Sequence, residues 1–249
     1  MWERKRVDPI NIESLLDHDL IEQYYQPIID LSTNDLYSHE SLMRNKRHLN
    51  PAGVFRAAIE NNRLYEIDAL CISKSIRSYF ALDGTRDGQT LFINIFPSSI
   101  LNRLFVPFLE NLMDQMQILP SCIVFELNET KEEEEIWETT ALKQMVSMLR
   151  KKGFRIAMDD VGDGTANLRK IVEFVPDFIK MSRYFSTHLS TTERKQRILK
   201  LFVDYCGKET RMVLEGIENP DDLACARNLG IALGQGYLLG EPEALQIIR

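Results

Sequence analysis

Residues 122–158, CIVFELNETKEEEEIWETTALKQMVSMLRKKGFRIAM, contain one full repeat of the pattern that decides the fold. The repeat begins with a short apolar, β-branched run at 122–127 and ends with a second such run at 155–158. Between them, Leu142, Met145, Met148 and Leu149 recur at the spacing of an amphipathic helix. Strand, helix and strand in this order predict two parallel strands joined by a helix.

The same alternation extends over most of the chain. Helical periodicity also marks residues 63–82, 100–112 and 197–205. Strand-like runs lie at 24–31, 36–42, 90–96, 122–127, 155–158, 178–181, 212–214 and 231–233. About eight strands in 249 residues predict a closed barrel of the α/β class, since a (β/α)8 barrel takes about 250 residues. The first strand is not followed by a GxGxxG motif, which counts against a dinucleotide fold.

The first two strands are expected to depart from a regular barrel. Only Ser32-Thr33-Asn34-Asp35 separates the runs 24–31 and 36–42, which is too short for a crossover helix. The pair is therefore predicted to be an antiparallel hairpin, and the fold a modified TIM-like (β/α)8 barrel with an antiparallel first strand. Since we find no Gly-, Pro- or Ser-rich linker and no internal repeat, we expect a single domain over 1–249, with about residues 1–20 as a short N-terminal lead-in.

Charge and composition argue against several classes of binding partner and site. The net charge of −7 argues against binding a DNA or RNA duplex, which requires a basic surface. No signal peptide and no run of about 18 apolar residues is found, so we expect a cytoplasmic protein with no membrane association. The four cysteines are widely separated and form no CxxC pair, so neither a zinc site nor a disulfide framework is expected.

Polar side chains follow the apolar runs at the ends of seven strands, where a parallel barrel carries its chemistry. Clustered carboxylates repel one another, and binding hard divalent cations keeps them ionised. Oxygen ligands favour Mg²⁺ or Mn²⁺, and a pair of such ions can clamp both oxygens of a phosphodiester displacement. Metal-assisted phosphodiester hydrolysis is therefore the predicted reaction class. The groups at these strand ends are Glu40, Asn94, Glu126, Asp159, Asp160, Lys180, Glu215 and Gln235.

Each of these residues alone also has an ordinary structural interpretation. A single strand-end acid is usually a helix N-cap or a solvated loop charge. The acidic run 132–135 is expected to be an exposed helix start, because the helix dipole favours negative charge there. The repetition of polar groups at successive strand ends favours one shared site.

The order of these motifs resembles the EAL-domain cyclic-di-GMP phosphodiesterase family. The resemblance runs from Tyr24-Tyr25-Gln26-Pro27-Ile28 to Gly234-Gln235-Gly236-Tyr237-Leu238. The signature Glu-Ala-Leu stands here as Glu40-Ser41-Leu42. The strand-end Asn, Glu-Leu-x-Glu, Asp-Asp-x-Gly, a lone Lys, Glu-Gly-x-Glu and Gly-Gln-Gly then follow in the family's order.

The resemblance implies hydrolysis of cyclic di-GMP to linear pGpG, in bacterial second-messenger signalling, with two Mg²⁺ or Mn²⁺ ions. It implies a homodimer as well. By matching position, the metal ligands are Glu40, Asn94, Glu126, Asp159 and Asp160, and the catalytic residues are Lys180, Glu215 and Glu40. The substrate-binding positions are Gln26, Leu42, Arg44 and Gln235, and Glu129 matches the residue that anchors the loop after the paired aspartates.

Three departures from the family pattern keep other functions open. Ser41 replaces the motif alanine, and Lys-Ile-Asp becomes Lys180-Met181-Ser182. The loop that usually reads Asp-Asp-Phe-Gly-Thr-Gly-Tyr-Ser-Ser-Leu reads DDVGDGTANL at 159–168. The main alternative is therefore a catalytically weak or inactive EAL domain that acts as a cyclic-di-GMP receptor or protein-interaction module. A metal-dependent phosphodiesterase with another diester substrate ranks lower. The retained metal-ligand positions favour the active enzyme.

Overall fold

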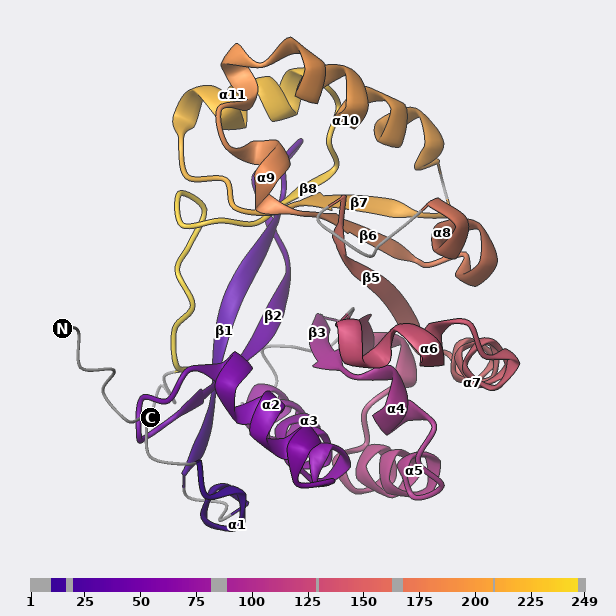
Figure 1. The fold of residues 1–249 in the computed structure, drawn as a ribbon. Coiled ribbons are helices and arrows are strands. Elements are labelled where there is room, and N and C mark those ends of the chain that lie inside the picture. The colour runs from indigo at the N-terminus through magenta and orange to yellow at the C-terminus, as the bar shows by residue number, and fades with distance from the viewer. Residues whose placement is uncertain are drawn as a thin grey trace, which may run out of the picture.

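Eight strands form a closed barrel in which each strand pairs with its neighbours in the sequence (Figure 1). The computed structural model describes residues 10–16, 20–81, 89–128, 130–162, 168–207 and 209–245. The strands are β1 (Ile21–Asp30), β2 (Leu36–Asn45), β3 (Thr90–Ile95), β4 (Ile123–Leu127), β5 (Arg155–Val161), β6 (Phe178–Met181), β7 (Arg211–Leu214) and β8 (Leu233–Gly234).

Helices surround the barrel and fill most of the connections between strands (Figure 1). The α-helices are α1 (Ile12–Leu15), α2 (Pro51–Glu60), α3 (Leu64–Phe80), α4 (Pro97–Ile100), α5 (Phe105–Met116), α6 (Glu134–Trp137), α7 (Thr140–Lys151), α8 (Leu168–Phe174), α9 (Arg183–Ser186), α10 (Glu193–Tyr205) and α11 (Pro220–Asn228). Within the described ranges, short 3₁₀ helices lie at Pro120–Cys122, Lys131–Glu133 and Leu189–Thr191. None of the helices in the described ranges has the length and apolar character needed to cross a membrane.

The predicted hairpin is confirmed. β1 pairs antiparallel with β2, and Gln26 lies opposite Glu40 in this register. β8 closes the barrel against the other edge of β1, also antiparallel, whereas β2 to β8 pair parallel throughout. The chain after β8 runs back along β1, where Glu243 forms a bridge with Tyr25 (Figure 1).

All eight predicted strands are found, in the predicted order, with shifted ends. β1 begins earlier than predicted, at Ile21, and β5 continues to Val161 instead of stopping at Met158. The extension of β5 arises because its ladder with β6 resumes at Val161 and Met181 after an irregularity. This irregularity lies at Asp159 and Asp160, and Asp160 adopts a left-handed backbone conformation with φ of 49°.

Side chains two positions apart on a strand point to the same face of the sheet. Apolar and polar side chains at this spacing therefore share the inner face of the barrel. A cluster of buried side chains fills the barrel interior, with Ile28, Phe92, Val124, Ala157, Phe178, Val213 and Leu233 as its members. Two positions later, on six of these strands or directly after them, stand Asn94, Glu126, Asp159, Lys180, Glu215 and Gln235. The alternation that points the first set inward therefore brings the second set together one layer above it.

One expectation for the acidic run 132–135 was wrong. Glu132, Glu134 and Glu135 are exposed, but Glu133 is only 4% exposed. Its Oε2 accepts a hydrogen bond of 2.7 Å from the backbone N–H of Ser98, at the start of α4. A carboxylate at this helix start satisfies a donor that has no partner within the helix, which compensates for its burial.

Candidate active site

Four carboxylates surround the ammonium group of Lys180 at the polar end of the barrel. Nζ of Lys180 lies 2.8 Å from Oε1 of Glu215, 2.9 Å from Oε1 of Glu126, 3.2 Å from Oε2 of Glu40 and 3.3 Å from Oδ1 of Asp159. The side chain of Lys180 is 1% exposed, and that of Glu126 is 0% exposed. The strand ends therefore converge as the sequence predicts, on a lysine that the barrel buries completely.

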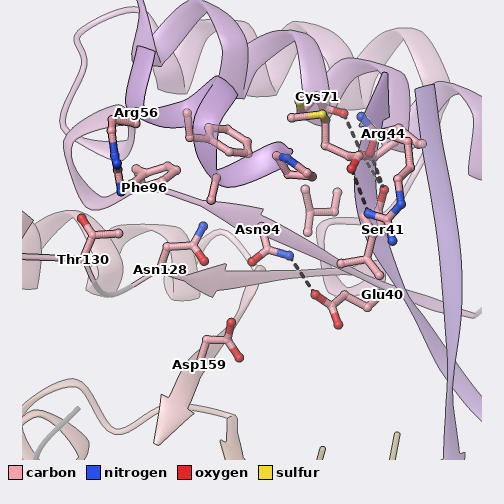
Figure 2. A pocket seen from close by; sticks show the side chains of 18 of the residues that line it. Glu40, Ser41, Arg44, Arg56, Cys71, Asn94, Phe96, Asn128, Thr130 and Asp159 are labelled. Carbon is pink, nitrogen blue, oxygen red and sulfur yellow. Dashed lines mark hydrogen bonds between the residues drawn. The ribbon is translucent and has the colours of Figure 1, made fainter. Parts of the chain in front are cut away.

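Hydrogen bonds from two amides fix the Glu40 carboxylate. Nδ2 of Asn94 donates to Oε1 of Glu40 at 2.9 Å, and Nε2 of Gln235 donates to Oε2 at 2.7 Å (Figure 2 shows the first). Nε2 of Gln235 also lies 3.1 Å from Oε1 of Gln26, whose own amide donates to the carbonyl of Gly240. This chain of amides holds Glu40 in one orientation.

Burial and neighbouring charge raise the pKa values of two of the four acids around Lys180. Burial raises the pKa of Glu126 well above its usual range, and the nearby Glu40 carboxylate raises it further. Burial raises the pKa of Glu215 to about 8, against the opposing attraction of Lys180. Oε2 of Glu126 is buried and has no hydrogen-bond partner among the described residues.

Lys180 and Glu40 remain charged in the same surroundings. Burial by itself lowers the pKa of Lys180, but the attraction of the four carboxylates is stronger and raises it well above the usual value. Burial by itself raises the pKa of Glu40, but Lys180 and the donors Gln235 and Asn94 lower it overall. One ammonium group faces four acids here, so the site favours further positive charge.

The donor set fits divalent cations. Asp159, Asp160 and Glu215 each offer a carboxylate oxygen, and these oxygens lie within 4.8 Å of one another. The unpartnered Oε2 of Glu126 adds another buried acceptor close by. Mg²⁺ and Mn²⁺ prefer ligand sets made only of oxygen atoms, and a cation here would relieve the repulsion among the acids.

Two cavities flank the acid cluster and share Glu40, Leu42, Asp159 and Asp160 in their walls. The first, of about 470 Å³, extends toward α2 and contains Arg44 (Figure 2). The second, of about 310 Å³, extends toward β8 and contains Gln26, Lys180, Glu215, Gln235 and Tyr237. The cluster therefore lies between two open spaces.

The structure places the predicted substrate-binding residues in these cavities. Leu42 lies in both, Arg44 in the first, and Gln26 and Gln235 in the second. The Arg44 guanidinium lies 5.8 Å from the centre of the Tyr24 ring, and its Nη1 donates to the carbonyl of Met43. Glu129 lies outside the described residues.

Sequence reasoning missed the helix that forms the outer wall of the first cavity. α2 begins at Pro51, after Asn50, whose side chain accepts a hydrogen bond from the backbone N–H of Ala52. Asn followed by Pro is a recognisable start signal for a helix. The face of α2 that lines the cavity carries Phe55 and Arg56, which the predicted site did not include.

Comparison with known proteins agrees with this geometry. The family model described as "EAL domain" matches residues 11–242. The cyclic di-GMP phosphodiesterase PdeB of Shewanella oneidensis is 28% identical over 250 residues, which are 95% of this chain and 28% of that protein. The cyclic di-GMP phosphodiesterase RocR of Pseudomonas aeruginosa is 29% identical over 234 residues, 91% of this chain and 58% of RocR. This chain therefore spans less than two thirds of the length of either relative.

Solved structures share the fold at lower identity. The EAL enzyme Bd1971, in its form bound to cAMP and cyclic di-GMP, aligns with a TM-score of 0.84 at 21% identity, over 94% of this chain and 65% of that one. BlrP1 of Klebsiella pneumoniae, as a manganese and cyclic-di-GMP complex, aligns with a TM-score of 0.80 at 24% identity, over 90% and 56%. Because the family model covers nearly the whole described barrel, this chain belongs to the EAL domain family.

Proposed function

We propose that this chain is a metal-dependent phosphodiesterase that hydrolyses cyclic di-GMP to linear pGpG, as part of bacterial second-messenger signalling. The observation that carries the proposal is the buried cluster of Glu40, Glu126, Asp159 and Glu215 around Lys180. Two cyclic-di-GMP phosphodiesterases among the relatives, and cyclic-di-GMP complexes among the solved structures, support the choice of substrate.

In this proposal, two Mg²⁺ or Mn²⁺ ions occupy the acid cluster. Glu40, Asn94, Glu126 and Asp159 would hold one ion, and Asp160 would hold the second. Bound divalent cations lower the pKa of water and stabilise charge on phosphoryl oxygens. The unpartnered oxygen of Glu126 and the adjacent oxygens of Asp159, Asp160 and Glu215 support this assignment.

Lys180 and Glu215 are assigned to the attacking water. Nζ of Lys180 would hold the water and, as the neutral amine that bound divalent cations favour, would accept its proton; Glu215, 2.8 Å away, would hold Nζ in position and add to the metal site. Glu40 is both a ligand and the centre of the amide network that orders the site.

The remaining assigned residues hold the substrate. Arg44 binds a phosphate by charge-assisted hydrogen bonds, and Leu42 packs against the nucleotide in both cavities. Gln26 and Gln235 position substrate or water, since their amides already meet beside Glu40. Glu129 is assigned to anchoring the loop after Asp160, by its match to the family motif alone.

The proposal includes a homodimer and a cytoplasmic location. α8 carries exposed Leu168 and Val172, and α10 carries exposed Ile198 and Leu201, apolar surface that a second copy would cover. Mass measurement by light scattering, with Val172→Glu and Leu201→Glu, tests the dimer. Cys71, Cys122, Cys206 and Cys225 all lie in the described ranges and form no disulfide there, which suits a reducing compartment.

The central test is product analysis with the purified protein and cyclic di-GMP, in the presence of Mn²⁺ or Mg²⁺ and in EDTA. We expect metal-dependent appearance of pGpG, and its loss in Glu40→Gln and Lys180→Ala. Lys200→Ala, which alters an exposed ion pair on α10, is the matched control and should retain turnover. Tight calorimetric binding without any turnover would instead establish the receptor function, and absence of binding would point to a protein-interaction module.

A further inference from the structure

One end of the first cavity is built for a flat apolar group. Along α2, Pro51, Ala52, Phe55, Arg56 and Ile59 all line the cavity, at the spacing of one helix face. The ring of Phe55 packs against that of Phe96, with centres 5.3 Å apart and planes tilted by 45°. Phe96 comes directly after β3 and also lines the cavity, so aromatic surface from two elements meets at this end.

Arg56 is the cationic group at this end of the cavity. Its side chain is exposed, and in the described part of the chain it forms no hydrogen bond or ion pair. Figure 2 shows it beside Phe96, on the opposite side of the cavity from Arg44. Thr130 lines the same cavity, and its hydroxyl has no hydrogen-bond partner among the described residues. Polar groups with unused hydrogen-bonding capacity therefore border the aromatic surface.

The position of Arg56 suits contact with a base of the substrate better than contact with the phosphate under attack. The scissile phosphodiester must lie at the acid cluster, where Glu40 and Asp159 stand, and Figure 2 shows Asn94 and Asn128 between this cluster and Arg56. A base is the flat, apolar part of a nucleotide and lies away from its phosphate. Aromatic side chains such as Phe55 and Phe96 stack against bases with little sequence preference, so a separate polar group must supply discrimination.

A guanidinium group discriminates guanine from adenine. Guanine presents two acceptors, O6 and N7, on one edge, and arginine donates to both. Adenine presents a donor, the N6 amino group, in place of O6, and arginine has no acceptor to pair with it. The same Arg56 would therefore favour a guanine diester over an adenine diester of equal shape and charge.

We propose that Arg56 is a specificity-determining residue that reads the O6 and N7 edge of one guanine base, which lies against Phe55 and Phe96. This inference rests on the proposed function, because it takes the substrate to be a cyclic dinucleotide cleaved at the acid cluster. It assigns base selection to α2, a segment that carries none of the metal-ligand positions.

The test compares Arg56→Met with the wild type on cyclic di-GMP and cyclic di-AMP, both as kcat/KM and as calorimetric affinity in EDTA. Methionine keeps the length of the side chain and removes its donors. We expect the kcat/KM for cyclic di-GMP to fall about 10-fold to 100-fold, mainly through KM, with the value for cyclic di-AMP unchanged. Arg194→Met, an exposed arginine of α10 outside both cavities, is the control and should match the wild type.

The outcomes separate this inference from the proposed function. An equal loss on both dinucleotides would show that Arg56 contacts phosphate, and no loss on either would show that it contacts nothing; each result overturns the inference while the phosphodiesterase stands. If the wild type binds but does not cleave, a selective loss of cyclic-di-GMP affinity in Arg56→Met supports the inference although the proposed activity fails. If the wild type neither binds nor cleaves either dinucleotide, both proposals fail.

Discussion

Nζ of Lys180 lies 2.9 Å from Oε1 of Glu126, and both side chains are at most 1% exposed. The two residues come from β6 and β4, which do not pair with each other in the sheet. They meet because both side chains point into the closed barrel, one layer above its apolar interior. A buried charge pair of this kind is costly to form and still more costly to break on one side.

Removing the ammonium should therefore destabilise the metal-free protein. Lys180→Met leaves Glu40, Glu126 and neighbouring carboxylates without their cation, and we expect a loss of about 3–5 kcal/mol in the free energy of unfolding at pH 8. Because the folded-state pKa values of Glu126 and Glu215 are already raised, these acids bind protons more tightly in the fold than in the unfolded chain. Their contribution to stability is present at low pH and is lost as the pH rises.

The loss in the free energy of unfolding caused by Lys180→Met should accordingly be smaller at pH 5 than at pH 8. Urea unfolding in EDTA at the two pH values measures it. Lys200→Met, in an exposed pair with Asp204, serves as the control and should change stability by less than about 1 kcal/mol at either pH. An equal deficit at both pH values would mean that the acids do not depend on Lys180 for charge compensation.

Divalent cations should stabilise the fold by occupying the acid cluster. A ligand that binds only the folded state adds about 2.7 kcal/mol at 100 times its Kd, so Mn²⁺ should raise the melting temperature and EDTA should reverse the rise. Asp160→Asn, which changes one member of the carboxylate group Asp159, Asp160 and Glu215, should reduce the shift. Differential scanning fluorimetry measures the shift, and Asp204→Asn controls for general charge effects. A full shift in Asp160→Asn would remove this residue from the ligand set.

Restoring the family's alanine at Ser41 should cost stability rather than activity. Ser41 Oγ donates to Oε1 of Gln23 at 3.1 Å and lies 2.8 Å from Oγ of Ser75, in a buried network that borders the first cavity. Ser41→Ala leaves the buried Gln23 oxygen without this donor, which costs about 1–2 kcal/mol. We expect urea unfolding to show this loss while kcat/KM stays within about twofold. Loss of turnover would place the hydroxyl in the catalytic arrangement instead.

Asp68 should make stability fall as the pH rises. Burial raises the pKa of Asp68 to about 7, although Ser99 and the backbone N–H of Phe96 partly oppose the shift. Between about pH 4 and pH 7 the unfolded chain ionises this acid while the fold keeps it protonated, so the fold loses up to about 4 kcal/mol over this window. Glu133, buried nearby, raises the pKa further.

Asp68→Asn removes that penalty and keeps an oxygen that can accept the hydrogen bond from Phe96. The melting temperature of the variant, relative to the wild type, should therefore rise steadily from pH 4 to pH 7 and then level off. Asp204→Asn, on the exposed face of α10, should show no such trend. A constant difference across the pH range would show that Asp68 is ionised throughout in the fold.

The sequence was sufficient for the order of the strands and for the hairpin. Strand and helix periods are local properties, and the short connection at residues 32–35 excludes a crossover whatever the rest of the chain does. The same local alternation accounts for the residues that share the inner face, because Phe92 and Asn94, or Val124 and Glu126, are two positions apart.

The sequence could not show what these residues contact. That Asn94 and Gln235 both donate to Glu40, or that buried Glu133 accepts from the start of α4, depends on how distant segments pack once the barrel closes. The place of Arg56 in the wall of the first cavity likewise depends on how α2 packs against the rest of the barrel. Local patterns determine the direction of each side chain, whereas distances between strands that are far apart in the chain are determined only by closure of the sheet, which no short stretch of sequence encodes.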